Sequence, residues 1–254
     1  MKAILSDIHG NLEALRAVLE DIDRLNVREV YCLGDVVGYG PDPRGCLDLV
    51  RQRCQVALLG NHERAVLADP EGFTPVARQA ALWTRSQLAA SVPDRPAGEA
   101  RWEFLATRPP GYVEGDCLFV HASPRDPVND YVFPYDCCNL PKMAEVFGRV
   151  SRCCFVGHTH LPGVFVEVLA GGLCQFFPPD PVGQGYRVNG RKALVNVGSV
   201  GQPRDGDWRA CYALVDGGNV YFRRVEYDVG ATVQKIRDIE GLDDMLGERL
   251  LLGR

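Results

Sequence analysis

The sequence predicts an α/β protein in which a largely parallel sheet has helices on both faces. Two patterns indicate this class: short β-rich apolar runs alternate with helical patterns through the first two-thirds of the chain, and beyond residue 160 such runs follow one another without helices. The second pattern favours a second, largely antiparallel sheet. With 254 residues, of which 46% are hydrophobic, the chain can bury a substantial core, and we expect one domain over residues 1–254.

The first elements follow a strand-helix-strand order. We expect strands at residues 2–7 (KAILSD), 28–35 (REVYCLGD) and 55–62 (QVALLGNH). Between them, residues 11–25 form an amphipathic pattern, and residues 43–53 form a helix that Pro43 opens. The apolar stripe of the first helix consists of Leu12, Leu15, Val18, Leu19, Ile22 and Leu25.

The middle of the chain is more helical. Residues 64–112 are expected to form a helical, cap-like insertion, with the best helix at 78–90 and prolines 93, 96, 109 and 110 after it. Strands at 116–123 and 152–159 then enclose a helix near 140–147. The expected strands of the second sheet are 163–168, 173–177, 192–199, 211–216 and 219–227, and closing helices are expected within 229–252.

Composition excludes several classes of function. A net charge of −5 gives no electrostatic footprint for a nucleic-acid backbone or an anionic membrane. The start, MKAILSDIHG, has too short an apolar stretch for a signal peptide or membrane span, so we expect a cytoplasmic location. The ten cysteines include no C-x-x-C pair, and we expect reduced, mostly buried thiols that act as small hydrophobes.

Polar residues cluster where the expected strands end. They are Asp7, His9, Asp35, Asn61, His62, His121, His158 and His160. A single histidine after an apolar run is usually a packed core residue, but here all five histidines of the chain occur at strand ends. Because the carboxyl ends of parallel strands meet at one edge of a sheet, these side chains can converge. Carboxylate, amide and imidazole groups suit divalent Mn, Fe, Zn, Ni or Co, and their number suits two ions.

Several motifs occur together in order: SDIHGN, GDVVGYGPDP, GNHE, a strand-end histidine, GHTH and NVGSVGQPRDGD. With them the sequence resembles the calcineurin-like metallophosphoesterases, in particular the compact prokaryotic branch of protein phosphatases and diadenosine-polyphosphatases. The resemblance extends from Met1 to about Tyr227. It implies a four-layer α/β/β/α sandwich, in which two mixed sheets lie back to back with helices outside.

The resemblance also implies roles for the strand-end residues. Asp7, His9 and His160 would bind one divalent ion, Asn61, His121 and His158 a second, and Asp35 would bridge the two. A hydroxide held between the ions would attack the phosphorus of a phosphate ester, and protonated His62 would assist the leaving oxygen. Glu63 either orients His62 or is a solvated carboxylate at a helix start.

Four further residues flank the motifs and are candidates for substrate binding: Asn11, Tyr39, Arg125 and Arg204. Arginine suits bidentate phosphate binding, although either arginine could equally be an ordinary surface residue. The expected partner is a phosphorylated small molecule or protein: a phosphomonoester, a phosphodiester or a dinucleoside polyphosphate. Loops 64–112, 123–138 and 176–188 would select among these.

Two other classes of protein are alternatives to a metal-dependent phosphoesterase. One is a non-catalytic metal-binding scaffold of the same fold, which the complete set of ligands and His62 disfavours. The other is a structural cysteine-metal protein, which the lack of C-x-x-C spacing disfavours. Metal content separates them, because the enzyme would bind about two divalent ions without thiolates.

Overall fold

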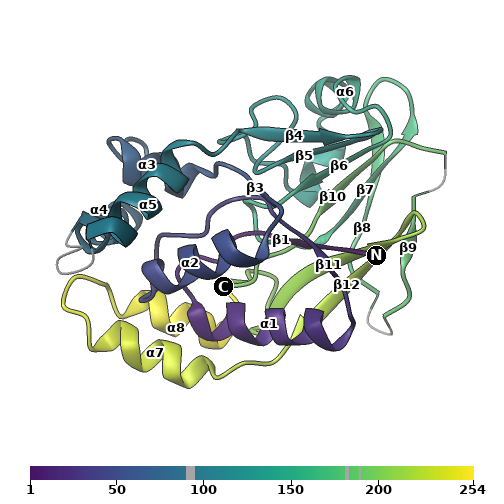
Figure 1. Ribbon diagram of the computed structural model, residues 1–254. Helices are drawn as coiled ribbons and strands as arrows, with labels where there is room; N and C mark the ends of the chain where they lie inside the picture. The colour runs from purple at the N-terminus through teal and green to yellow at the C-terminus, as the bar shows by residue number, and fades with distance from the viewer. Residues whose placement is uncertain (90–94, 181–182, 189) are drawn as a thin grey trace.

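The computed structural model describes residues 1–89, 95–180, 183–188 and 190–254. Two six-stranded sheets pack against each other, and helices cover their outer faces (Figure 1). Both sheets are mixed, with parallel and antiparallel strand pairs. The expected four-layer α/β/β/α sandwich is therefore confirmed. Ala90 and Pro93 of the predicted insertion, and residues 181 and 182 of the predicted 176–188 loop, lie outside the described residues.

The first sheet has the order β3-β2-β1-β11-β12-β9. Its strands are β1 (Lys2–Leu5), β2 (Glu29–Cys32), β3 (Val56–Ala57), β9 (Tyr186–Arg187), β11 (Ala210–Asp216) and β12 (Asn219–Val225). The three N-terminal strands are parallel, as the βαβ pattern predicts. Beyond β1 the pairing becomes antiparallel, because the β11–β12 hairpin adds to the open edge of β1.

The second sheet has the order β4-β5-β6-β10-β7-β8. Its strands are β4 (Gly111–Glu114), β5 (Cys117–Val120), β6 (Cys153–Val156), β7 (Gly163–Leu169), β8 (Leu173–Phe177) and β10 (Ala193–Asn196). The expectation that the later strands form an antiparallel sheet of their own is wrong. They divide between the two sheets, since β10 pairs in parallel with β6 whereas β11 pairs with β1.

Alternation along the strands divides the core into three layers. In β1, Ile4 faces the other sheet, whereas Ala3 and Leu5 face the helices. The inner layer includes Phe119 and Phe155, whose rings stack at 5.1 Å. Outside the first sheet lie α1 (Leu12–Arg24) and α2 (Pro43–Arg53), and outside the second lies α6 (Leu140–Gly148).

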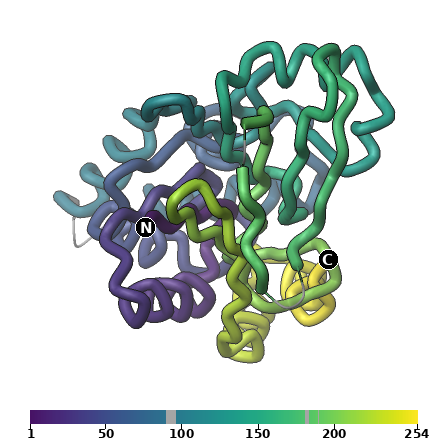
Figure 2. The backbone as a smooth tube through the Cα atoms, turned by 90° about the vertical axis from the view of Figure 1, so that its right-hand side faces the viewer, coloured from purple at the N-terminus to yellow at the C-terminus, as the bar shows by residue number. Residues whose placement is uncertain are grey.

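Further helices occur in addition to these three. They are α3 (Asn61–Leu67), α4 (Pro75–Ala89), α5 (Arg95–Ala106), the 3₁₀ helix η1 (Pro134–Cys138), α7 (Val229–Arg237) and α8 (Met245–Leu252). Figure 2 shows the C-terminal helices at the same end of the molecule as α1, and Thr232 and Lys235 of α7 both hydrogen-bond to Glu13 of α1. None of the helices in the described ranges has the length and apolar composition needed to cross a lipid bilayer.

One pair of cysteines departs from the expectation of reduced thiols. Cys117 of β5 and Cys153 of β6 occupy opposite positions in the parallel pair, with their Cα atoms 4.8 Å apart, and they form a disulfide. Five of the other cysteines are buried free thiols, as expected: Cys32, Cys46, Cys154, Cys174 and Cys211. The expectation of reduced thiols is wrong for this pair because the register of β5 and β6 places the sulfurs of Cys117 and Cys153 side by side. Local sequence does not show that register.

Phe147 provides a test of the outer layer beside the second sheet. Its side chain is fully buried among Val120, Met143 and Leu194. We expect Phe147→Ala to lower the free energy of unfolding by about 3–5 kcal/mol, because it removes buried contacts and leaves a cavity. Leu252→Ala, at a side chain that is 56% exposed, is the control and should change stability little. Denaturant unfolding followed by circular dichroism measures both, and equal losses would contradict the assignment.

Candidate metal centre

The strand-end residues of both sheets converge on one buried site. Asp7 and His9 follow β1, Asp35 follows β2, Asn61 and His62 begin α3, His121 follows β5, and His158 and His160 follow β6. All of these except Asn61 are buried, and Asn61 is half-buried. The structure thus brings together every residue of the predicted metal centre, although they span more than half of the chain.

Backbone strain is concentrated at the same positions. Five of these residues have φ in the left-handed region: Asp7 (54°), His9 (49°), Asp35 (53°), His158 (65°) and His160 (61°). Residues other than glycine seldom adopt such φ values, and they persist only where surrounding contacts enforce them. One such contact is the 2.9 Å hydrogen bond that the His9 amide donates to the Asp35 carbonyl. These strained turns direct the side chains away from the strands and into a common site.

A first cluster consists of Asp7, His9 and His160. The Nε2 atoms of His9 and His160 lie 3.1 Å apart, and His160 Nε2 lies 3.2 Å from Asp7 Oδ1. A second cluster consists of Asp35, His121 and His158, in which His121 Nε2 lies 3.1 Å from His158 Nδ1. Each cluster combines one carboxylate with two imidazoles.

Asp35 lies between the two clusters. Its Oδ2 atom is 3.3 Å from His121 Nε2 in the second cluster and 3.8 Å from His9 Nε2 in the first. The amide oxygen of Asn61 adds a fourth donor to the second cluster, 3.1 Å from His121 Nε2. The arrangement fits the predicted ligand set, in which one carboxylate serves two ions.

Backbone carbonyls determine which ring nitrogens face the clusters. His9 donates from Nδ1 to Val37 (3.2 Å), and His160 donates from Nδ1 to Gln202 (2.6 Å). His158 donates from Nε2 to Asn129 at 3.3 Å. A ring nitrogen that donates carries the proton of a neutral imidazole, so the opposite nitrogen presents a lone pair.

These lone pairs suit the binding of a cation. The Nε2 atoms of His9 and His160 both present lone pairs to each other across 3.1 Å, which is repulsive unless positive charge neutralises the site. Burial acts to lower the pKa of His121, yet Asp35 raises it to about 9. Burial acts to raise the pKa of Asp35, but His121 and His62 hold it well below its usual range. The donor set therefore fits divalent metal ions with nitrogen and oxygen ligands.

Glu63 does neither of the two things expected of it. It is buried, and its Oε2 atom accepts hydrogen bonds from the amides of Asp35 (2.7 Å) and Gly60 (2.8 Å). Its Oε1 atom accepts from the amide of Val36 at 2.7 Å. Glu63 therefore holds the turn that carries Asp35, and it is neither a partner of the His62 ring nor a solvated helix-start carboxylate.

The imidazole of His62 is buried beside both clusters. Its Nδ1 atom lies against Gly38, where an added Cβ would approach to 2.2 Å, and has no hydrogen-bond partner among the described residues. Nε2 is thus left for the cavity. Burial lowers the pKa of His62 to about 4. The ring also lies close enough to His9 and Asp35 to share a metal ion with them. The position of His62 is therefore compatible with two roles, metal ligand and proton donor.

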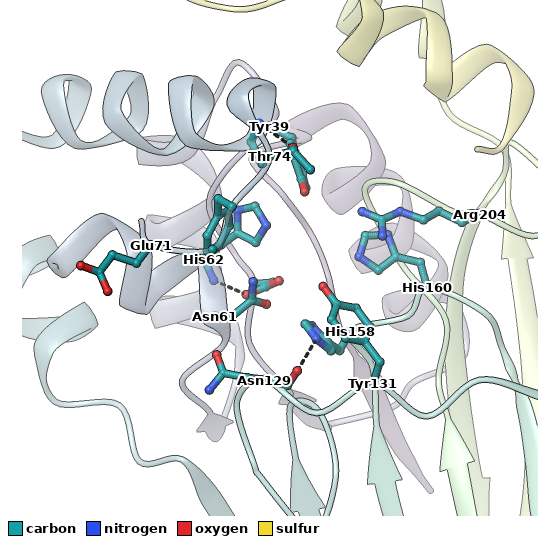
Figure 3. Close-up of a pocket in the computed structure, with 14 residues that line it drawn as sticks. Tyr39, Asn61, His62, Glu71, Thr74, Asn129, Tyr131, His158, His160 and Arg204 are labelled. Atoms are coloured by element: carbon teal, nitrogen blue, oxygen red, sulfur yellow. Dashed lines mark hydrogen bonds between the residues drawn. The ribbon is translucent and has the colours of Figure 1, made fainter. Parts of the chain in front are cut away.

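A cavity of about 330 Å³ opens beside the clusters. Figure 3 shows Asn61 and His62 on one side of it and Tyr131, His158, His160 and Arg204 on the other. Two of the predicted substrate-binding residues, Tyr39 and Arg204, line this cavity. The Nε atom of Arg204 is buried, and no hydrogen-bond partner for it occurs in the part of the chain that the structure describes.

The other two predicted substrate-binding residues lie elsewhere. Asn11 caps α1, because its Oδ1 atom accepts from the amide of Ala14 at 3.1 Å, and its Nδ2 atom donates to the Gly201 carbonyl at 2.9 Å. Arg125 pairs with Glu145 at 2.9 Å and faces a separate surface depression. Proximity to a ligand in the sequence therefore does not decide whether a residue reaches the cavity, because Tyr39 lines it whereas Asn11 caps a helix.

Sequence reasoning missed several residues that line the cavity. Phe73 and Thr74 come from the loop before α4, and Asn129 and Tyr131 come from the loop after β5. They belong to the loops 64–112 and 123–138 that were expected to select substrate, whereas none of the described residues of loop 176–188 lines this cavity. Alternating aromatic residues at 131, 133 and 135 were an available signal.

Known proteins are similar to this chain in sequence and fold. The family model of calcineurin-like phosphoesterases matches residues 3–162. An uncharacterized protein of Methanocaldococcus jannaschii is 36% identical over 263 residues, which cover 100% of this chain and 98% of that protein. The crystal structure of a metallophosphoesterase from Sphaerobacter thermophilus is 37% identical, covers 99% of each chain and superposes with a TM-score of 0.83. A hypothetical protein from Pyrococcus horikoshii, 22% identical with 100% and 98% coverage, shares the fold with a TM-score of 0.73.

Asn11→Ala tests the structural role of this side chain. We expect the free energy of unfolding to fall by about 2–4 kcal/mol, because the helix cap is lost and the Gly201 carbonyl loses a buried donor. The matched control is Asn139→Ala, at an exposed residue that caps α6, which should cost only about 1 kcal/mol. Thermal and denaturant unfolding measure both variants. Unchanged stability of Asn11→Ala with a raised KM would restore Asn11 to the substrate-binding residues.

Asp35→Asn tests the bridging position. We expect both metals to be lost or strongly weakened, because one carboxylate lies within reach of both clusters. Elemental analysis of the purified protein after dialysis against Mn²⁺ gives the metal content. Asp216→Asn, at a half-exposed carboxylate in β11, should retain the wild-type content. Retention of two ions by Asp35→Asn would show that Asp35 does not bridge.

Proposed function

The chain belongs to the calcineurin-like phosphoesterase family, and on this premise we propose that it is a hydrolase that cleaves phosphate esters with two divalent metal ions. One observation carries the proposal: two buried clusters present converging imidazole lone pairs, and Asp35 lies between them. A structural site would need only one cluster and no adjoining cavity. Here both clusters adjoin the same cavity, where an ester could reach them.

Each cluster would hold one ion of Mn, Fe, Zn, Ni or Co. Asp7, His9 and His160 would bind the first, and Asn61, His121 and His158 the second, with Asp35 shared. When bound, two such ions polarise phosphoryl oxygens and lower the pKa of water toward neutrality. The protein's own contribution is to hold the seven ligands in fixed orientations through strained turns and carbonyl hydrogen bonds.

Arg204 is proposed to bind the phosphate. Its Nη2 atom donates to Gln202 Oε1 at 2.9 Å, which orients the guanidinium, while no described residue accepts from its buried Nε–H. Leaving a buried donor unsatisfied costs free energy, so an anionic oxygen in the cavity would relieve that cost. Tyr39, which lines the same cavity, is proposed as a second substrate contact.

His62 is proposed as the acid that assists the leaving group. With its pKa lowered to about 4, its imidazole is neutral near pH 7 in the absence of substrate. A phosphate in the cavity places negative charge beside the ring, which favours the protonated form. His62 would then donate the proton on Nε2 to the departing oxygen, while Nδ1 stays against Gly38.

The segment 64–112 is proposed to act as a cap within a single domain. Phe73, Thr74 and Ala77 from this segment line the cavity, and the ring of Phe73 packs edge-on against that of His62 at 4.9 Å. The cap would exclude water on the side where the leaving group departs. Substituents of the substrate would meet this segment and the loop of Asn129 and Tyr131 before they reach the ligands.

The alternative is a metal-binding scaffold without catalysis. The experiment that separates the two is a panel of nitrophenyl monoesters and diesters, assayed with Mn²⁺, Zn²⁺, Fe²⁺, Ni²⁺ and Co²⁺ in turn. Metal-dependent release of nitrophenol supports the enzyme and identifies monoester or diester preference. Two bound ions without turnover of any ester would favour the scaffold.

His62→Ala separates chemistry from metal binding. We expect metal content near wild type but turnover lower by about 10²–10⁴-fold, the range for loss of a general acid. The loss should be larger for an alkyl ester, whose departing oxygen needs a proton, than for a nitrophenyl ester, which leaves as a stable anion. Elemental analysis and steady-state kinetics on both esters give the comparison.

Two results would contradict this role. Loss of one ion in His62→Ala would make His62 a ligand, as its proximity to His9 and Asp35 permits. Equal losses on both esters, with both ions retained, would point to positioning or electrostatic help in place of proton donation. Circular dichroism spectra of the variant and the wild type exclude misfolding as a cause.

A further inference from the structure

Three aromatic side chains form a row that leads away from the metal centre. Tyr131, Phe133 and Tyr135 alternate along the segment before and into η1, and we call them the aromatic ladder. Val132, between the first two, is buried in the core beside α6. Alternate residues of an extended segment point to opposite sides, so the rings of Tyr131 and Phe133 share the side away from that core. Tyr135 lies in η1, and its ring continues the row by stacking on Phe133.

The rings of the ladder stack in sequence. Tyr131 stacks on the imidazole of His158, with centroids 3.9 Å apart. Tyr131 and Phe133 are nearly parallel, at 3° and 5.6 Å, and Phe133 and Tyr135 follow at 18° and 5.2 Å. Parallel rings at these separations are offset, which leaves part of each face uncovered. A continuous aromatic surface thus extends from a candidate metal ligand outward.

The two ends of this surface are open to solvent, and Phe133 between them is half-buried. Tyr131 is 44% exposed and Tyr135 is 69% exposed. Tyr131 also lines the cavity, and Figure 3 shows its ring beside His158 and facing the centre of the cavity. A contiguous exposed apolar surface next to a cavity is typical of a ligand-binding groove. A ligand with its phosphate at the metal centre would have the ladder along its path outward.

We propose that the aromatic ladder is a stacking platform for a nucleobase, and hence that the substrates are nucleoside phosphates. The inference rests on the proposed function, because it places the phosphate of the same molecule at the metal centre. Flat parallel rings match the flat face of a base, and such stacking tolerates different bases. For the main-chain groups of a phosphopeptide, the ladder side chains offer only the phenol hydroxyls of Tyr131 and Tyr135 as hydrogen-bond partners. The net charge of −5 disfavours a long nucleic-acid strand and leaves small nucleotides.

The test compares two ligands that differ only by the base. Adenosine 5′-monophosphate and ribose 5-phosphate are titrated by calorimetry into the Mn²⁺-loaded wild-type protein. We expect the nucleotide to bind about tenfold more tightly or better, as one stacked base contributes in other proteins. Phe133→Leu and Tyr135→Leu should each reduce this ratio, because leucine keeps bulk but removes the flat face. Neither residue is among those that line the metal clusters.

A matched control is Tyr112→Leu on β4, at an aromatic side chain that is 37% exposed and lies outside the cavity lining. It should leave the affinity ratio unchanged. Equal affinity of the wild type for the two ligands, or a full ratio in both ladder variants, would overturn the inference. Tighter binding of phosphoserine peptides with aromatic neighbours, without a gain from the base, would assign the ladder to phosphoproteins.

Failure of the proposed function can be distinguished from failure of the nucleobase inference. If the metal-loaded protein binds neither ligand and hydrolyses no nitrophenyl ester, the phosphoesterase assignment is overturned together with the inference. If it hydrolyses esters and binds both ligands equally, only the nucleobase platform is overturned. Because the wild-type measurement alone can decide, misfolding of one ladder variant does not prevent a conclusion.

Discussion

The Asp7 carboxylate accepts the backbone amide of His158 through both of its oxygens, at 3.0 and 3.2 Å, and this contact joins the two sheets at the metal centre. Gly157 makes it possible, because a Cβ there would lie 2.3 Å from Asp7 Oδ2. With the sheets held this closely, ligands that follow β1 and β2 meet ligands that follow β5 and β6. The two clusters, the position of Asp35 between them and the cavity all depend on this spacing.

Local sequence predicted the features that lie at the ends of strands and helices. Asp7, His9 and His160 were identifiable because polar residues follow apolar runs, and Pro43 marked the start of α2. Pairing of distant strands was beyond reach, since β11 carries no local sign that it will lie beside β1. The same limit concealed the bonds from Asn11 to Gly201 and from Glu63 to Asp35, which only the folded chain creates.

The C-terminal third of the chain supports the site without supplying a ligand. Residues 3–162 match the family model and carry every proposed ligand, yet Gln202 orients His160 through its carbonyl and Arg204 enters the cavity. Tyr39 packs against an apolar cluster that α4 shares with α7 and α8. In this chain the proposed ligands thus lie in the segment that matches the family model, whereas part of the cavity wall comes from residues beyond it.

The strand order of the sheets determines when each sheet can be completed during synthesis of the chain. β10 lies between β6 and β7, and β11 lies between β1 and β12. Neither sheet can therefore be completed before a strand beyond residue 190 has been synthesised. Folding that depends on such distant pairings is slow, and a nascent chain emerges from its N-terminus first. All candidate ligands thus leave the ribosome well before the strands that bring them together. The candidate metal centre is consequently assembled only after these late strands have been synthesised.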